Sequence, residues 1–88
     1  MEYTKERYGV LKQKYAAGGS KAYYLAVFGN ALAEREGYKG LDGMDAIFFY
    51  LIQKHNWLPK DVRSMSYDDI TFVLSEEMAD WTAPPEAR

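Results

Sequence analysis

The residue in this chain best suited to catalysis or metal binding is its single histidine, His55. No cysteine is present, which excludes a Cys/His pair. A Ser-His-Asp set could draw on Ser64 or Ser66 with Asp61, but the spacing of these residues matches no nucleophilic motif. A lone histidine at a helix end is more often structural than a metal ligand. The sequence therefore predicts no enzyme, no metal site and no cofactor.

Two pairs of adjacent carboxylates, Asp68-Asp69 and Glu76-Glu77, are the other groups that could support chemistry. Glycosidase-type catalysis needs two carboxyl groups that face each other across a cleft. Neighbouring residues on one helix point about 100° apart, so neither pair meets this condition by itself. The better interpretation is a solvated helix face, with Asp68 and Asp69 stabilising a helix N-terminus.

The composition is that of one small domain with a packed core. The chain has 88 residues, of which 48% are hydrophobic and 16% aromatic, unlike a disordered segment. The lack of cysteine fits a reducing compartment. No stretch approaches the roughly 20 apolar residues of a membrane span, and residues 1 to 5 lack the apolar run of a signal peptide. We therefore expect a soluble cytoplasmic protein with no membrane partner.

Charge is distributed unevenly along the chain. Residues 1 to 40 hold seven Lys/Arg and four Asp/Glu, a net of +3, whereas residues 41 to 88 hold four and nine, a net of −5. The ordinary interpretation is two solvated faces. The functional one is head-to-tail association, or a basic partner on the acidic half, so homo-oligomerisation is left open. A nucleic-acid binder usually has a basic excess or stripe, so no nucleic-acid partner is expected.

Apolar spacing and turn residues predict helices over the first half of the chain. The first covers residues 2 to about 16 and ends at Gly18-Gly19. The second runs from about Lys21 to Glu36, with Ser20 as its N-cap. Gly29 lies in the middle of this helix at a propensity cost of ~1 kcal/mol, which indicates close packing against a neighbouring element.

The third predicted helix, about Gly43 to His55, follows Asp42 as its N-cap. It is hydrophobic nearly all round, which is typical of a central helix. A buried strand is the rival interpretation of such a short apolar run. The helical spacing and the preceding polar cap favour a helix.

The run from Trp57 to Ile70 is predicted to be a compact hinge. Pro59 cannot continue the preceding helix, and it is well placed to open a short helical turn over residues 59 to 63. Ser66 then caps a new helix, with Asp69 three residues later in a pattern similar to a capping box.

That fourth helix is predicted from Tyr67 to about Trp81, and residues 82 to 88 are expected to be extended because they contain Pro84-Pro85. The expected fold is therefore all-α: a small four-helix domain over residues 1 to 81, with a short extra helical turn after Pro59 and an extended C-terminal tail.

Seven side chains are candidates for contact with a protein partner: Trp57, Arg63, Phe72, Glu76, Glu77, Asp80 and Trp81. Glu77 falls within the apolar stripe of the last helix, so it needs either a cationic partner, for which Arg63 is a candidate, or a place at the rim. Phe72 lies opposite that stripe and is either covered by the first helix or exposed. Tyr23 and Val27 raise the same question on the second helix.

The two tryptophans have two interpretations. Trp57 and Trp81 are best explained as core anchors, with a partner-binding pocket as the alternative, because Trp and Arg dominate binding hot spots.

A longer pattern spans residues 46 to 81: an apolar helix, then Trp-x-Pro, a Val or Ile, a Met or Leu, a Ser or Thr cap, and a Leu/Ile-rich helix. Its residues here are Phe48-Phe49-Tyr50-Leu51-Ile52, Trp57-Leu58-Pro59, Val62, Met65-Ser66, Asp69-Ile70, Val73-Leu74 and Glu76 to Trp81. This part, about 40% of the chain, resembles small phage tail assembly proteins of the tail assembly chaperone group.

The resemblance implies a non-enzymatic binder in the cytoplasm of an infected bacterium. Its partners would be tail proteins, such as the tape measure or the tail tube subunit. The resemblance also implies a groove, lined by the second, third and fourth helices, that could receive an amphipathic helix. Asp69, Glu76 and Asp80 would then supply its polar rim. A small phage-encoded inhibitor of a host or competing-phage complex is the rival interpretation, since such proteins share this composition. A helix-turn-helix nucleic-acid binder is disfavoured, because the last helix is acidic and lacks the Arg, Lys, Asn or Gln of a recognition helix.

Overall fold

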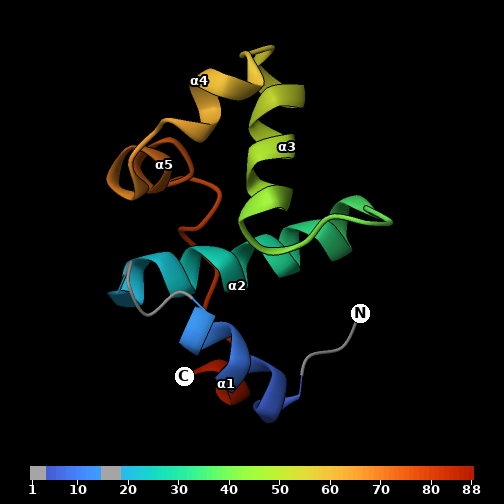
Figure 1. Ribbon diagram of the computed structural model, residues 1–88, viewed down its shortest axis with the longest axis vertical. Coiled ribbons are helices and arrows are strands. Elements are labelled where there is room, and N and C mark those ends of the chain that lie inside the picture. The colour runs from blue at the N-terminus through green and yellow to red at the C-terminus, as the bar shows by residue number, and fades with distance from the viewer. Residues whose placement is uncertain (1–3, 15–18) are drawn as a thin grey trace.

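The computed structural model describes residues 4–14 and 19–88, which are all-α and contain no strand (Figure 1). The helices are α1 (Lys5–Lys14), α2 (Gly19–Glu36), α3 (Gly43–His55), α4 (Pro59–Arg63) and α5 (Tyr67–Val73), followed by the 3₁₀ turn η2 (Pro85–Ala87). The predicted all-α class is confirmed, and the strand alternative for the apolar run of α3 is wrong.

The central helix is α2, not α3. Figure 1 shows α3, α4 and α5 on one side of α2, and α1 with η2 on the other. Because it is covered from both sides, α2 buries residues around most of its circumference: Ala22, Tyr23, Leu25, Ala26, Val27, Phe28, Gly29, Leu32 and Ala33. Phe49 on α3 is partly exposed, so the nearly continuous apolar surface of α3 is not fully covered.

The crossing of α2 and α3 depends on Gly29, and the close packing predicted for this residue is confirmed. A Cβ atom at Gly29 would lie 1.9 Å from the backbone oxygen of Gly43. Asp42 occupies the N-cap position of α3 in an extended conformation, but its side chain makes no capping hydrogen bond. Instead the Gly43 N–H donates to Asn30 Oδ1 at 2.8 Å. Capping by a neighbouring helix fixes α3 directly on α2.

The second half of the chain begins its helices where the sequence predicts. α3 and α4 have the expected bounds, and Pro59 lies in the first turn of α4. Asn56 closes α3 in the left-handed conformation, with φ 57°. Ser66 Oγ accepts a hydrogen bond from the Asp69 N–H at 3.0 Å, which confirms the predicted cap of α5.

The first half agrees with the prediction less closely. α1 begins at Lys5, and the expected end at Gly18 lies outside the described residues. α2 begins at Gly19, so Ser20 is inside the helix and is not its N-cap. Gly19 takes a φ of 73°, which an L side chain rarely adopts, and this lets the chain enter the helix before the serine.

α5 is much shorter than the helix predicted to reach Trp81. It ends at Val73, and residues 74 to 80 continue as turns. Their hydrogen bonds mix two spacings: Ser75 N–H to Phe72 O at 3.2 Å and Met78 N–H to Leu74 O at 2.9 Å. This irregular segment buries Leu74 and brings the Trp81 ring to 5.3 Å from that of Phe28.

The C-terminal residues are not simply extended, as the sequence predicted. Pro85–Ala87 form the turn η2, in which Ala87 is buried. The hydroxyl of Tyr23 donates to the Ala87 carbonyl oxygen at 2.6 Å, across 64 positions of sequence. Pro85 in the first position favours a helical turn, and the bond to Tyr23 holds that turn against α2.

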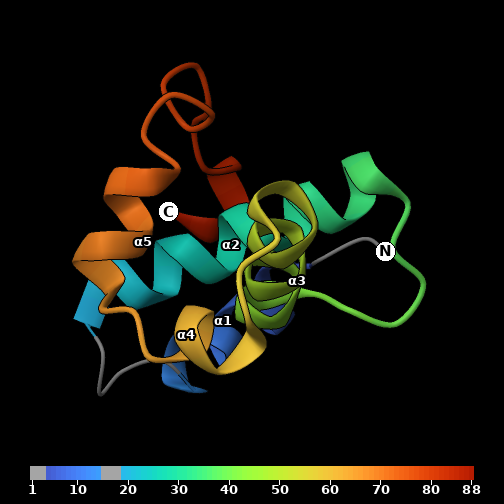
Figure 2. The same cartoon turned by 90° about the horizontal axis from the view of Figure 1, so that it is seen from above.

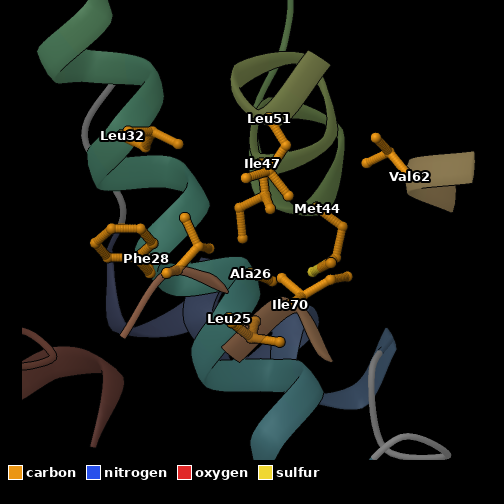
Figure 3. Packing of buried hydrophobic residues seen from close by; sticks show 10 residues of the cluster. Leu25, Ala26, Phe28, Leu32, Met44, Ile47, Leu51, Val62 and Ile70 are labelled. Atoms are coloured by element: carbon orange, nitrogen blue, oxygen red, sulfur yellow. The ribbon is translucent and has the colours of Figure 1, made fainter. Parts of the chain in front are cut away.

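The core has two parts. The larger, in which side chains of α2, α3, α4 and α5 meet (Figure 3), consists of Leu25, Ala26, Phe28, Leu32, Met44, Ile47, Leu51, Val62, Ile70 and Leu74. The smaller, on the other side of α2, consists of Tyr8, Tyr23, Val27 and Ala87. Tyr23 and Val27, whose surroundings the sequence left open, are therefore covered by α1 and η2. No described helix is both long and apolar enough to cross a membrane.

Candidate protein-binding surface

α5 divides sharply into an inward and an outward side. Ile70 and the C-cap residue Leu74 are one turn apart and are both buried in the larger core. Phe72 lies between them in sequence, so its side chain points about 200° away from that of Ile70. It is 80% exposed, more than any other large hydrophobic side chain of the described residues. Of the two possibilities that the sequence left open for Phe72, the exposed one is therefore correct, and α1 does not cover the ring.

Acidic side chains surround Phe72 in sequence. Residues 66 to 81 contain five Asp/Glu and no Lys/Arg, and four of these acids are exposed. Asp69 shares the outward side of α5 because it precedes Phe72 by three residues. We call the exposed set Asp68, Asp69, Phe72 and Glu76 the acidic face, whereas Asp80, also exposed, lines a cleft against α2. Within the described part of the chain, the one ion pair of the acidic face joins Asp68 to Lys21 at the beginning of α2, close to α5 (Figure 2).

Glu77, unlike its neighbour Glu76, turns inward. Its carboxylate accepts hydrogen bonds from the Tyr50 hydroxyl and from Lys54 Nζ, the latter at 2.6 Å. The Glu77 side chain is 19% exposed. Burial alone would raise the pKa of Glu77, but the bonds from Lys54 and Tyr50 outweigh it and hold the pKa below its ordinary value. The same contact raises the pKa of Lys54.

The partner predicted for Glu77 was wrong. Arg63 is exposed at the end of α4, whereas the turns after α5 direct Glu77 toward α3. The sequence analysis missed Tyr50 and Lys54. These two residues are four apart on α3 and therefore share a face. A Tyr and a Lys at that spacing on a largely apolar helix were the available signal for a carboxylate nearby.

The two tryptophans have different environments. Trp81 packs edge-on against Phe28 and is partly buried, consistent with the predicted anchoring role. It also closes a cleft of about 280 Å³ between α2 and the turns after α5, lined by Phe28, Ala31, Leu32, Arg35, Glu77, Asp80 and Trp81. α3 does not line this cleft, which therefore forms only part of the predicted groove.

Trp57 is not a core anchor. It is 38% exposed at the corner between α3 and α4, because Asn56 turns the chain away from the core. Its ring stacks on His55 with centroids 4.2 Å apart. The next residue, Leu58, is 62% exposed. The helix that follows carries Lys60 and Arg63 against Asp61, a net of +1, so this second apolar surface is weakly basic where the α5 surface is acidic.

The described residues offer no group of three or more His, Cys, Asp or Glu side chains arranged to hold a metal ion. No family model, curated protein or solved structure matches this chain. Fold and surface alone therefore define its class: a small all-α domain with an exposed phenylalanine on an acidic face.

Proposed function

We propose that this protein is a non-catalytic binding module that holds a basic, amphipathic segment of another protein against its acidic face. The observation that carries the proposal is Phe72, 80% exposed in a stretch of sixteen residues with five acids and no base. Aromatic side chains supply much of the binding energy at protein interfaces. An acidic surface that contains no Lys or Arg attracts a positively charged partner.

The helix that carries Phe72 is held rigidly in place. Phe72 is on a capped helix whose opposite side is anchored by Ile70 and Leu74. An anchor that is already fixed loses little conformational entropy when a partner binds. The corner at Trp57 and Leu58 is also apolar, but the helix beside it has a net charge of +1, so it lacks the acidic excess that would select a basic partner.

The biological setting in this proposal comes from the resemblance of residues 46 to 81 to phage tail assembly proteins. The partner would then be a phage tail protein, such as the tape measure or the tail tube subunit, met in the cytoplasm of the infected host. An extended tape-measure helix with basic and apolar side chains would complement the acidic face in charge and offer an apolar contact to Phe72.

The test is affinity purification of the tagged protein from cells infected with a phage that encodes it, followed by identification of the co-eluting proteins. Tail proteins should co-elute with the unaltered chain, and their yield should fall at least tenfold for Phe72→Ala and for Glu76→Lys. The matched control is Leu58→Ala, which removes an exposed apolar side chain from the basic corner and should leave the yield unchanged.

Two results would contradict the proposal. Loss of the partner with Leu58→Ala and retention with Phe72→Ala would place binding at the corner. Recovery of a host complex without tail proteins would overturn the tail assembly role and favour the rival function, a phage-encoded inhibitor.

A further inference from the structure

The outer side of α1 carries a hollow whose chemistry is the reverse of the acidic face. Its volume is about 220 Å³, and it is lined by Arg7, Val10, Leu11 and Lys14. Val10 is 68% exposed. α1 has four basic residues and one acidic residue, a net of +3. Two apolar side chains with cations before and after them therefore form a second surface of mixed apolar and charged character.

The two surfaces match in sequence register. On α1, Arg7, Val10 and Lys14 stand at spacings of three and four residues. On the acidic face, Asp69, Phe72 and Glu76 stand at the same spacings in sequence, with Asp69 and Phe72 on α5 and Glu76 on the turns that follow Val73. Each surface thus has an apolar centre between two like charges, and the charges of one surface are opposite to those of the other. The charge signs are opposite whichever direction the two segments run, and the spacings coincide when the segments run parallel.

One chain cannot readily use both surfaces on itself. α1 lies on one side of α2, and α5 lies on the other (Figures 1 and 2). Phe72 is therefore placed to meet the hollow of a second chain, while its own hollow remains available to a third. Such a contact joins two different patches, and a heterologous contact builds rings or open chains of subunits.

We infer that copies of this protein associate head to tail, with Phe72 of one chain seated between Val10 and Leu11 of the next. Arg7 and Lys14 then face the carboxylates of Asp69 and Glu76. The inference rests on the proposed function in that both use the acidic face, so a basic partner and a second copy compete for Phe72. Self-association would keep this face covered until the partner arrives.

The test uses the purified chain alone, with its mass measured by sedimentation or light scattering over a range of concentrations. The average mass should rise with concentration, and the rise should weaken at high salt because exposed charges are screened. Phe72→Ala and Val10→Glu should each weaken association at least tenfold. Leu58→Ala, the matched control on another exposed surface, should associate as the unaltered chain does.

Mixing the two variants identifies the geometry. Phe72→Ala retains a normal hollow and Val10→Glu retains a normal acidic face, so an equimolar mixture should form a 1:1 dimer and nothing larger. Contact between two acidic faces would instead be insensitive to Val10→Glu, and contact between two hollows would be insensitive to Phe72→Ala. Either result would overturn the head-to-tail arrangement. Helical circular dichroism of each variant, expected to be unchanged, separates loss of contact from unfolding.

Failure of this inference is distinguishable from failure of the proposed function. A chain that stays monomeric at every concentration, yet loses its tail partner with Phe72→Ala, overturns self-association and leaves the binding proposal standing. A chain that associates as described but captures no tail protein overturns the binding proposal and leaves self-association standing. If the chain both self-associates and binds a tail protein, adding that tail protein should dissociate the self-associated species.

Discussion

The two sides of α2 are stabilised in different ways. On the side of α3, α4 and α5, ten buried apolar residues form a continuous core. On the side of α1 and η2, the buried cluster has four members, Tyr8, Tyr23, Val27 and Ala87, and a buried hydrogen bond. The first side is built from segments that follow one another in the chain, whereas the second joins the two ends of the described sequence. Apolar burial is the main source of stability on the side of α3, α4 and α5. On the side of α1 and η2, the hydrogen bond between Tyr23 and Ala87 contributes a larger share.

This difference predicts an uneven stability across the molecule. Tyr8 is the one residue of α1 that is buried, so α1 has little apolar surface to hold it in place. Regions with few buried contacts open at lower free energy than the core to which they are attached. We expect α1 and η2 to open together, at less cost than α3 or α5.

The largest expected effect is that of Gly29→Ala. The added methyl group would lie 1.9 Å from the Gly43 oxygen, so α2 and α3 must move apart and the larger core must loosen. We expect a loss of about 3 kcal/mol in the free energy of unfolding, measured by urea denaturation.

The matched control for Gly29→Ala is the same substitution on the other side of α2. Gly9 is exposed in α1, and nothing lies within 4 Å of a Cβ atom placed there. Gly9→Ala should raise α1 helicity and stabilise this region by about 0.5 to 1 kcal/mol, the usual advantage of alanine over glycine in a helix. Equal effects at the two glycines would contradict the contrast between the two sides.

The second prediction concerns the contact that closes the smaller cluster. Burial raises the pKa of Tyr23, which keeps its hydroxyl protonated and able to donate. Tyr23→Phe leaves the buried Ala87 carbonyl without this donor and should cost about 1.5 kcal/mol. Amide hydrogen exchange should show the loss in α1 and η2, while α3 keeps its protection.

Tyr24→Phe is the control for Tyr23→Phe, because the adjacent ring is only partly buried and its hydroxyl has no comparable buried acceptor. We expect little change. If Tyr23→Phe instead lowered protection uniformly across α3 and α5, the smaller cluster would be part of one cooperative core.

The signals that the sequence carried well were local ones. Pro59 and the Ser66 cap act within one helical turn, so their effects could be derived from residue type and spacing. Gly29 also pointed correctly to a close approach, although not to Gly43 as the neighbour. Helical spacing placed Phe72 opposite the apolar stripe of α5, but it left open whether the first helix covers the ring, and the structure shows that it does not.

Contacts between distant segments were the ones that sequence reasoning missed. Asn30 caps α3 from another helix, and Glu77 pairs with Tyr50 and Lys54 rather than with Arg63. Tyr23 holds the C-terminus, which made the predicted extended tail wrong. A single sequence shows that a buried carboxylate needs a partner, but the choice between two cations depends on where the chain bends. Here the bend follows Val73, inside a segment whose apolar spacing suited a continuous helix.

The third prediction compares the adjacent acids Glu77 and Glu76 on the larger side. Glu77→Gln should cost about 1 kcal/mol at neutral pH, since it weakens a partly exposed ion pair with Lys54 and a bond from Tyr50. The pKa of Glu77 is lower in the folded state than its ordinary value of 4.5, so the ionised form stabilises the fold above that pH. This contribution disappears as the pH falls through the folded pKa.

Unfolding curves recorded from pH 7 to pH 3 should therefore show the unaltered chain and Glu77→Gln converging at the acid end. Glu76→Gln, an exposed change one residue away, should follow the unaltered chain throughout. A constant gap between Glu77→Gln and the unaltered chain would mean that packing, and not charge, is what Glu77 contributes.

The smallest expected effect on stability is that of Phe72→Ala. The ring is 80% exposed, so its removal leaves no cavity and takes away little buried surface. Alanine is also the better helix former, by a few tenths of a kcal/mol. The free energy of unfolding should therefore stay within about 0.5 kcal/mol of the original, in contrast to substitutions at the buried neighbours Ile70 and Leu74. Since the fold does not need this side chain, a variant that unfolds normally but loses its partner assigns Phe72 to binding. A large loss of stability would instead place the ring in contact with the rest of the molecule and remove the basis for the acidic face.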